Sequence, residues 1–208
     1  MSTHDKNYLL AKKKYLNFLK NQEVLGEPFF DKIGQFKKFY IPISNKIFKK
    51  FRKKNNTLIV GLSGGQGSGK STIAQILKLI IKARFNLNTI NFSIDDYYKT
   101  YKERQKMSKK FGKLFLTRGV PGTHDTKLLF KHLKNFKSNN FSKVKIPQFD
   151  KSKDDRMIKT KWKKIKKKQD IIIFEGWCVG AKAQKKNNLR KPINILEKKE
   201  DKNLTWRK

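Results

Sequence analysis

The feature that most constrains the fold of this chain is the glycine-rich stretch GGQGSGKS at residues 64–71. It matches the pattern GxxxxGK followed by Ser or Thr without a mismatch, and it lies between a short apolar run at 57–62 and a segment at 71–83. In that segment the apolar residues recur every three or four positions, which places them on one face of a helix. A strand, this pattern and a helix in that order predict a loop that binds the phosphates of a nucleoside triphosphate.

Each residue type in this stretch suits contact with phosphate. Glycines let the backbone curve around the phosphates with its N–H groups inward, and the start of a helix adds partial positive charge. Lys70 can reach the β- and γ-phosphates, and Ser71 can coordinate Mg²⁺. We therefore expect ATP and Mg²⁺ as cofactors and Lys70 as a catalytic residue. The expected nucleotide-binding residues are Gly64, Gly65, Gln66, Gly67, Ser68, Gly69, Lys70, Ser71 and Thr72.

Acidic residues follow two further predicted strands. Residues 88–94 form the next strand after the helix, and a strand–helix–strand unit of about forty residues indicates a parallel sheet with a right-handed crossover. Asp95 and Asp96 follow this strand, and Glu175 ends the apolar run at 170–175. Because the carboxyl ends of parallel strands share an edge with the phosphate-binding loop, we expect Asp95 and Glu175 near the γ-phosphate.

Two roles are open to these acids. One carboxylate can accept the proton of an acceptor hydroxyl while the other holds Mg²⁺ or its water. The candidate metal ligands are Ser71, Asp95 and Glu175, and the candidate catalytic acids are Asp95 and Glu175. The alternative for both acids is that they are exposed residues at strand ends. For Asp96 we favour a helix N-cap.

Two polar clusters lie between these elements, at residues 118–125 and at residues 147–152 with Arg156 close behind. Each joins cationic or neutral hydrogen-bond donors to turn residues, which suits an anionic, hydroxylated acceptor. The alternative is structural: His124 can cap the helix expected at 125–136, and Asp150 can pair with a neighbouring lysine.

The rest of the chain predicts a helical N-terminal extension, residues 1–56, and an α/β domain, residues 57–208, in which helices flank a parallel sheet. The extension is basic and amphipathic, so it either packs on the main domain, which we favour, or lies on a membrane surface. Further elements are expected as a helix at 96–111, a loop at 114–123, a short strand at 144–149 and a lysine-rich surface segment at 159–168. After Gly180 the sequence predicts little structure.

The net charge of +36 suggests nucleic-acid binding, but the composition argues against it. The 52 basic residues are 45 Lys and 7 Arg, and Ile (19) and Asn (16) far outnumber Val (5). Lys, Ile and Asn have A/T-rich codons, so we interpret most of the charge as genome bias on a solvated surface. We expect no specific nucleic-acid partner, with a basic nucleic-acid-binding NTPase as the alternative. The positive field still attracts anionic small molecules.

Several classes of protein are disfavoured by what the sequence lacks. No apolar run approaches the roughly 20 residues of a membrane span, and the N-terminus has no apolar signal region. The one cysteine, Cys178, excludes an internal disulfide framework and a multi-cysteine zinc site. We therefore expect a cytoplasmic protein.

Five segments together resemble the D-glycerate 3-kinases of plants, cyanobacteria and fungi. They are GLSGGQGSGKST, SIDDYY, RGVPGTHD, PQFDKS with a following DR, and FEGW. That family is a branch of the P-loop kinases that includes uridine kinase and phosphoribulokinase. The similarity runs from about Leu58 to Gly180, and RGVPGTHD and FEGW are its narrowest motifs.

The resemblance implies transfer of the γ-phosphate of ATP to the 3-hydroxyl of D-glycerate, which in a photosynthetic cell serves photorespiration. By motif match Asp95 would be the base and Glu175 the acidic residue at the strand end. A small carboxylate acceptor is consistent with cationic residues around it. The residues that would contact this acceptor are Arg118, His124, Asp125, Asp150, Lys151 and Arg156.

The chain departs from the family pattern in two places. The segment between Ser152 and Arg156 is shorter than usual, which weakens the assignment of Arg156. Kinases of this kind also continue past the FEGW strand with an arginine-bearing lid, a further strand and an adenine-contacting segment. This sequence stops soon afterwards, inside an expected helix, so we interpret the domain as incomplete at its C-terminus. We expect the chain alone to bind nucleotide weakly and to transfer phosphate slowly.

Overall fold

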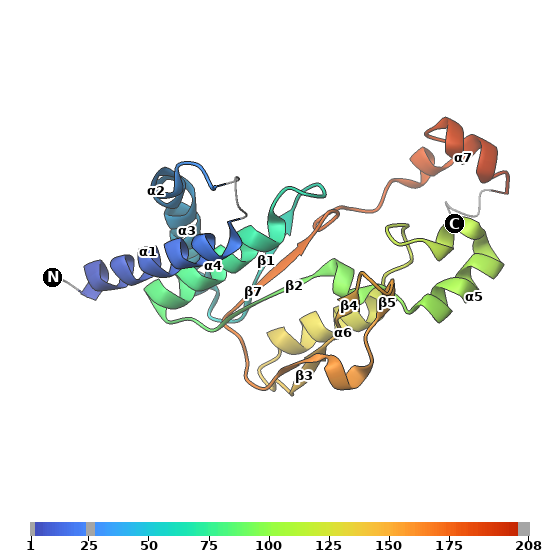
Figure 1. The fold of residues 1–208 in the computed structure, drawn as a ribbon. Helices are drawn as coiled ribbons and strands as arrows, with labels where there is room; N and C mark the ends of the chain where they lie inside the picture. The colour runs from blue at the N-terminus through green and yellow to red at the C-terminus, as the bar shows by residue number, and fades with distance from the viewer. Residues whose placement is uncertain (1–2, 24–27, 204–208) are drawn as a thin grey trace.

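The computed structural model describes residues 3–23 and 28–203 of the chain. At its centre lies a parallel sheet of β1 (Leu58–Ser63), β7 (Ile171–Gly176) and β2 (Thr89–Ser93), in the order β1-β7-β2 (Figure 1). Both outer strands pair with β7 from its first residue, Ile171, and all of β7 is buried. A run of isoleucines suits a strand that is covered on both faces. The expected α/β fold with a parallel sheet is confirmed.

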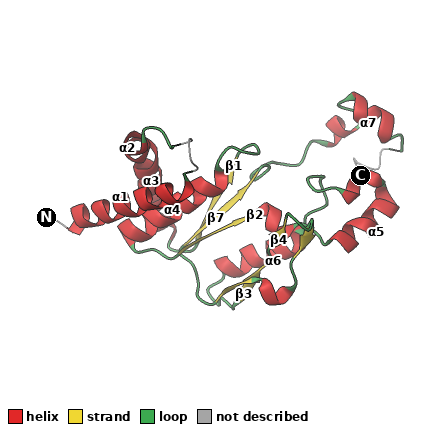
Figure 2. Ribbon diagram, in the orientation of Figure 1, coloured by secondary structure: helices red, strands yellow, loops and turns green. Residues whose placement is uncertain are grey.

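Helices from the first part of the chain cover one face of this sheet. α4 (Lys70–Phe85) connects β1 to β2 and packs on alternate sheet residues such as Ile171 and Ile173. α1 (Thr3–Gln22) lies along α4 (Figures 1 and 2), so the N-terminal segment packs on the main domain as expected. Between α1 and β1 come α2 (Lys32–Gln35), the π-helical turn η1 (Phe36–Tyr40) and α3 (Ile41–Lys54).

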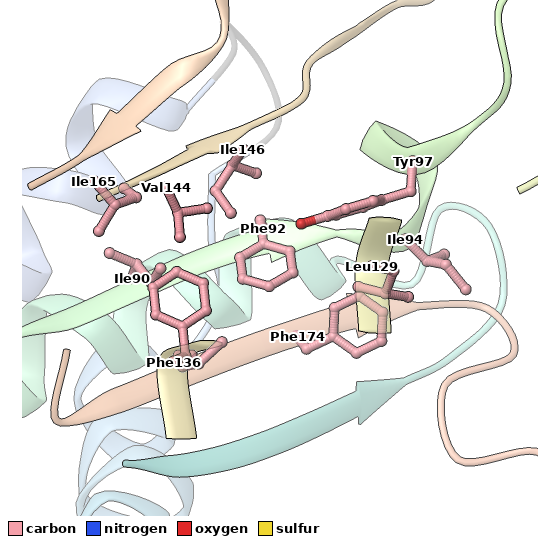
Figure 3. Close-up of a cluster of buried hydrophobic side chains, with 11 residues drawn as sticks. Ile90, Phe92, Ile94, Tyr97, Leu129, Phe136, Val144, Ile146, Ile165 and Phe174 are labelled. Atoms are coloured by element: carbon pink, nitrogen blue, oxygen red, sulfur yellow. The ribbon is translucent and has the colours of Figure 1, made fainter. Parts of the chain in front are cut away.

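The other face of the sheet packs on a second hydrophobic cluster (Figure 3). There Phe92 of β2 and Phe174 of β7 meet Phe136 of α6 (Thr126–Lys137). A short antiparallel ribbon of β3 (Val144–Ile146) and β6 (Lys163–Ile165) contributes further apolar side chains. The remaining elements between β2 and β7 in the chain are η2 (Ile94–Tyr97), α5 (Tyr101–Phe111), η3 (Lys113–Leu116), β4 (Phe149–Asp150), β5 (Asp155–Arg156) and η4 (Lys159–Lys161).

The structure differs from the sequence-based expectation in the second half of the chain. The helix expected at 96–111 is two elements, η2 and α5, because each begins with its own capping box. The strand expected at 144–149 is interrupted at Pro147, and part of the lysine-rich segment forms β6. After Gly180 the structure contains η5 (Lys186–Leu189) and α7 (Ile195–Glu200), where little structure was expected. The helix expected at the end of the sequence, residues 203–208, lies outside the described residues except for Asn203.

Within residues 3–23 and 28–203, no helix combines the length and the apolar character that a membrane crossing requires. The division of the chain at residue 57 stays a prediction.

Candidate active site

The phosphate-binding loop joins β1 to α4 and has the backbone that its glycines predict. Gly67 and Gly69 adopt left-handed φ angles of 72° and 74°, which favour glycine. A Cβ atom at either position, or at Gly65, would meet no other atom within 4 Å, so this side of the loop is open. Gly69 is the N-cap of α4 and provides no side-chain cap to the first-turn amides. The Lys70 ammonium donates to the carbonyl oxygen of Gly65, which keeps it over the loop.

The first turn of α4 is joined to the end of β7 by one hydrogen bond. Ser71 Oγ donates to Glu175 Oε1 at 2.7 Å, and Glu175 is only 4% exposed. Its other oxygen, Oε2, is buried and has no hydrogen-bond partner among the described residues. An unsatisfied buried carboxylate oxygen is costly, so this atom marks a place for a further ligand.

This pair is suited to Mg²⁺. A hydroxyl and a carboxylate are hard oxygen donors, and Mg²⁺ usually takes only one or two protein carboxylates together with phosphate and water. The described residues contain no group of three or more His, Cys, Asp or Glu that could hold a metal ion. Ser71 and Glu175 therefore fit a Mg²⁺ ion that arrives with the nucleotide.

Asp95 and Asp96 have different environments although they are neighbours in sequence. Asp96 Oδ2 accepts from the Ser93 amide at 3.1 Å, and burial raises the pKa of Asp96, with the charges of Asp95 and Glu175 adding to the effect. Asp95 is 28% exposed, and its Oδ2 lies 3.1 Å from Lys151 Nζ. Asp96 is thus engaged with the backbone of its own turn, whereas Asp95 is partly exposed, and the catalytic role of Asp95 stays a prediction.

The N-cap expected for Asp96 is wrong by three positions. Ser93 is the N-cap of η2, and its Oγ accepts from the Asp95 amide at 3.1 Å. Asp96 instead occupies the third position of the same capping box.

His124 is buried beside Asp95 and does not cap a helix. Its ring stacks on Tyr98 with centroids 4.0 Å apart, and its Nε2 has no hydrogen-bond partner among the described residues. Burial lowers the pKa of His124, and the nearby Asp95 partly opposes this. The helix that follows is capped by Asp125, whose Oδ1 accepts from the Leu128 amide at 3.1 Å. The helix cap expected as the alternative for His124 is therefore wrong, and its contact with a substrate stays a prediction.

Two of the candidate acceptor residues bind each other. Arg156 Nη1 lies 3.1 Å from Asp125 Oδ2, and Arg156 Nη2 lies 3.2 Å from Glu103 Oε2. Asp150 closes a turn: its Oδ1 accepts from the Ser152 amide at 3.0 Å and from the Ser152 hydroxyl at 2.6 Å. The hydrogen bond from Ser152 is the main cause that lowers the pKa of Asp150.

The candidate residues therefore separate into two sets. The structure brings the phosphate-binding loop, Glu175, Asp95, Lys151 and His124 to the carboxyl-end edge of the sheet. Arg156, Asp125 and Asp150 are engaged in contacts that organise the neighbouring loops. Their roles toward a substrate stay predictions. The first set places a phosphate-binding loop beside carboxylates, an arrangement that can serve phosphoryl transfer.

Three residues near the candidate site were not predicted as functional from the sequence: Tyr98, Arg104 and Asp154. Tyr98 forms the stacking partner of His124, and Arg104 is completely buried within hydrogen-bond distance of Asp154. Nothing in the sequence separates Arg104 from the other cations of a basic helix. Asp154 has a left-handed φ of 50°, and the two adjacent aspartates, Asp154 and Asp155, were the available hint of a tight turn.

Comparison with known proteins places these residues in a family. A sequence model described as the phosphoribulokinase / uridine kinase family matches residues 59–191. An uncharacterized kinase of Schizosaccharomyces pombe is 39% identical over 149 residues, which cover 66% of this chain and 53% of that protein. The chloroplastic D-glycerate 3-kinase of Arabidopsis thaliana is 31% identical over 133 residues, which cover 60% of this chain and 29% of that protein.

A solved structure gives a similar result. The D-glycerate 3-kinase of Cryptococcus neoformans superposes with a TM-score of 0.64 at 26% identity, over 72% of this chain and 56% of that one. The chain spans about half the length of the Schizosaccharomyces relative. The family match covers more than half of this chain and includes every candidate residue from Gly64 to Glu175. The chain belongs to the phosphoribulokinase / uridine kinase family of P-loop kinases.

Proposed function

We propose that this protein is an ATP-dependent kinase whose acceptor is D-glycerate, with 3-phosphoglycerate as the product. The observation that carries the proposal is the 2.7 Å contact between Ser71 and Glu175, directly after the phosphate-binding loop, with Asp95 at the end of the neighbouring β2. An oxygen-donor pair and a partly exposed carboxylate at the same edge of the sheet support transfer of a γ-phosphate between them.

The chain's own residues would act on the nucleotide first. The amides of the loop and of the first turn of α4 bind the phosphates, and Lys70 moves from the Gly65 carbonyl to the β- and γ-phosphate oxygens. Mg²⁺, when bound by Ser71 and Glu175, supplies positive charge that neutralises the phosphates.

Asp95 would then prepare the acceptor. Its carboxylate accepts the proton of the attacking hydroxyl, which leaves the oxygen free to bond to the γ-phosphorus as the bond to ADP breaks. Lys151, at 3.1 Å from Asp95, is suited to exchange this contact for one with the acceptor. His124, kept neutral by burial, offers its unpartnered Nε2 to an acceptor hydroxyl.

The choice of D-glycerate rests on the relatives and on charge. Two relatives, from Arabidopsis thaliana and Cryptococcus neoformans, are D-glycerate 3-kinases. A carboxylate acceptor also requires cations, and Lys151 contacts Asp95 while Arg118 lies over Phe149, next to Tyr98. The alternative is a nucleoside acceptor of the uridine kinase type, since the family includes such enzymes.

A coupled assay of ADP release tests the proposal, with D-glycerate, uridine and ribulose 5-phosphate as acceptors. We expect release above the ATPase background with D-glycerate alone, and none with the Lys70→Ala variant. Activity with uridine alone would show that the acceptor is a nucleoside and not D-glycerate. A parallel titration measures binding of Mg·ATP. If no binding is detected at millimolar concentration, the proposed kinase activity is rejected.

A further inference from the structure

A buried arginine ties together three loops next to the candidate acceptor residues. Arg104 of α5 is 0% exposed. It donates to the carbonyl oxygens of Lys99 at 3.3 Å and of Leu116 at 2.6 Å, and also to that of Asp154. These carbonyls belong to the loop before α5, the end of η3 and the turn between β4 and β5. Arg104 is therefore a fixed point for this part of the molecule.

Asp154 connects this fixed point to a second arginine. One carboxylate oxygen of Asp154 lies 2.9 Å from Arg104 Nη2, and the other lies 2.7 Å from Arg118 Nε. The backbone of Asp154 has a φ of 50°, a left-handed conformation that aspartate and asparagine tolerate better than most residues. Asp154 Oδ2 accepts a hydrogen bond from the completely buried Arg104, and the charge of this anchored carboxylate holds Arg118 close by in an ion pair.

Arg118 is thereby held over the ring of Phe149, which in turn contacts Tyr98. Its guanidinium carbon lies 5.3 Å from the centre of the Phe149 ring, and that ring is in edge contact with Tyr98. Burial raises the pKa of Tyr98, the charge of Asp95 adds to this, and the charge of Arg118 opposes it. The Tyr98 amide also donates to the Asp95 carbonyl oxygen at 3.2 Å, so a series of contacts leads from Arg118 through Phe149 and Tyr98 to Asp95.

The contact with Asp154 is an ion pair on the Nε side of the Arg118 guanidinium, because Asp154 Oδ1 accepts no hydrogen bond from the described residues. Arg118 is 33% exposed, and among the residues that the structure describes none accepts a hydrogen bond from its two Nη groups. Arginine binds a carboxylate in two parallel hydrogen bonds when its planar fork is held in place. The two Nη groups of Arg118 form such a fork.

We infer that Asp154 is a positioning residue, which holds Arg118 in an ion pair so that the two Nη groups receive the carboxylate of a small hydroxy-acid acceptor. This inference rests on the proposed function and specifies how the acceptor's charge is recognised. It also gives the acceptor site a preference for an anionic molecule over a neutral one.

Calorimetric titration with D-glycerate, with and without saturating Mg·ADP, tests this role. We expect Asp154→Asn, which suits the same backbone, to raise the Kd for D-glycerate about tenfold and to leave the Kd for Mg·ADP unchanged. Asp31→Asn is the matched control, because Asp31 also has a left-handed backbone, with φ of 40°, in the loop before α2. This control should bind D-glycerate as the parent protein does.

A double-mutant cycle separates positioning from a general structural role. If Asp154 acts through Arg118, Asp154→Asn should weaken D-glycerate binding in the parent protein and change nothing further in an Arg118→Ala background. Additive effects of the two substitutions would overturn the inference, and so would a Kd for D-glycerate unaffected by Asp154→Asn.

Two further results would also overturn the inference: a purely structural role of Asp154, and failure of the parent protein to bind D-glycerate. Asp154→Gly is the second variant, since glycine accepts a φ of 50°. If both Asp154 variants lose Mg·ADP binding and melt at lower temperature, Asp154 is only structural and the inference is wrong. Parent protein that binds Mg·ADP but not D-glycerate also overturns it and leaves nucleotide binding intact, whereas absence of Mg·ADP binding rejects the proposed kinase.

Discussion

At the scale of single residues, Glu175 stands out because its two carboxylate oxygens have unequal surroundings. Oε1 accepts from Ser71, while Oε2 is buried with no partner among the described residues. A carboxylate in this state destabilises the fold unless another ligand compensates, so it is retained for a reason other than packing. Asp95, at the end of the adjacent strand, is instead partly open and in contact with Lys151.

The Glu175→Gln variant tests the first of these acids. It keeps the size of the side chain and removes its charge, so we expect nucleotide affinity in the presence of Mg²⁺ to fall about 10- to 100-fold, from a loss of about 1–3 kcal/mol. The melting temperature should not fall, because an uncompensated buried charge is removed. Fluorescence titration with Mg·ATP measures the affinity. Glu23→Gln is the control, because Glu23 lies in the N-terminal segment, far from Glu175 in the sequence.

The Asp95→Asn variant tests the second acid. Loss of a general base costs about 10²- to 10⁴-fold in rate, while ATP binding does not depend on it. We therefore expect kcat to fall by that factor with an unchanged Kd for ATP. Asp96→Asn is the companion variant, expected to lower stability more than rate. If phosphoryl transfer survives in Asp95→Asn and is lost in Asp96→Asn, the general base is Asp96 and not Asp95.

At the scale of elements, short helical turns and their caps hold the acceptor side together. Ser93 with Asp96 and Thr100 with Glu103 form consecutive capping boxes, so the chain turns sharply between β2 and α5. The turn η2 is then fixed to α6 by a hydrogen bond of 3.0 Å between Tyr97 Oη and His132 Nδ1. Asp95 therefore lies on η2, a turn that its own capping box and the hydrogen bond to α6 hold in place.

The link through His132 predicts a pH dependence of stability. Burial lowers the pKa of His132, so the unfolded chain takes up its proton at a higher pH than the folded protein does. The free energy of unfolding should therefore fall as the pH drops below about 6.5, by at most about 1.4 kcal/mol per pH unit for one histidine.

Urea unfolding between pH 7.5 and 5 measures this effect. His132→Gln should reduce the dependence, with the remainder assigned to His124, whose pKa is also lowered by burial. The exposed His4 supplies the control variant, His4→Gln, which should keep the parent dependence. A His132 variant with the full parent slope would contradict the prediction.

At the scale of the whole molecule, the N-terminal helices belong to the folded core. Tyr15 of α1 and Phe36 of η1 stack with ring centres 5.1 Å apart and pack in one cluster with Ile76 and Ile80 of α4. Since α4 begins at the phosphate-binding loop, the same helix connects this cluster to the candidate site. The N-terminal segment thus helps to hold α4 in place.

Two phenylalanines of the same turn provide a matched test of this packing. Phe36 is 0% exposed and Phe39 is 59% exposed. We expect Phe36→Ala to lower the free energy of unfolding by about 3–5 kcal/mol, and Phe39→Ala by about 0.5 kcal/mol or less. Chemical denaturation monitored by circular dichroism measures both. Equal, small effects would show that the N-terminal helices do not contribute to the cooperative core.

The sequence by itself determined the phosphate-binding loop, the parallel α/β fold and the acids at the strand ends. These depend on contiguous patterns, such as residues 57–83, in which a strand, glycines and a helix follow one another. Side chains in such a pattern are brought together by the local backbone, so their arrangement is visible without knowledge of distant parts of the chain.

Only the tertiary structure decided which distant residues pair. Ser71 and Glu175 are 104 positions apart, and Arg104 is one of 52 basic residues with no local sign that it is buried against Asp154. The same holds for Arg156, which binds Asp125 and Glu103. Such contacts arise because folding the sheet and its covering helices encloses particular side chains, and charge and burial then select their partners from across the chain.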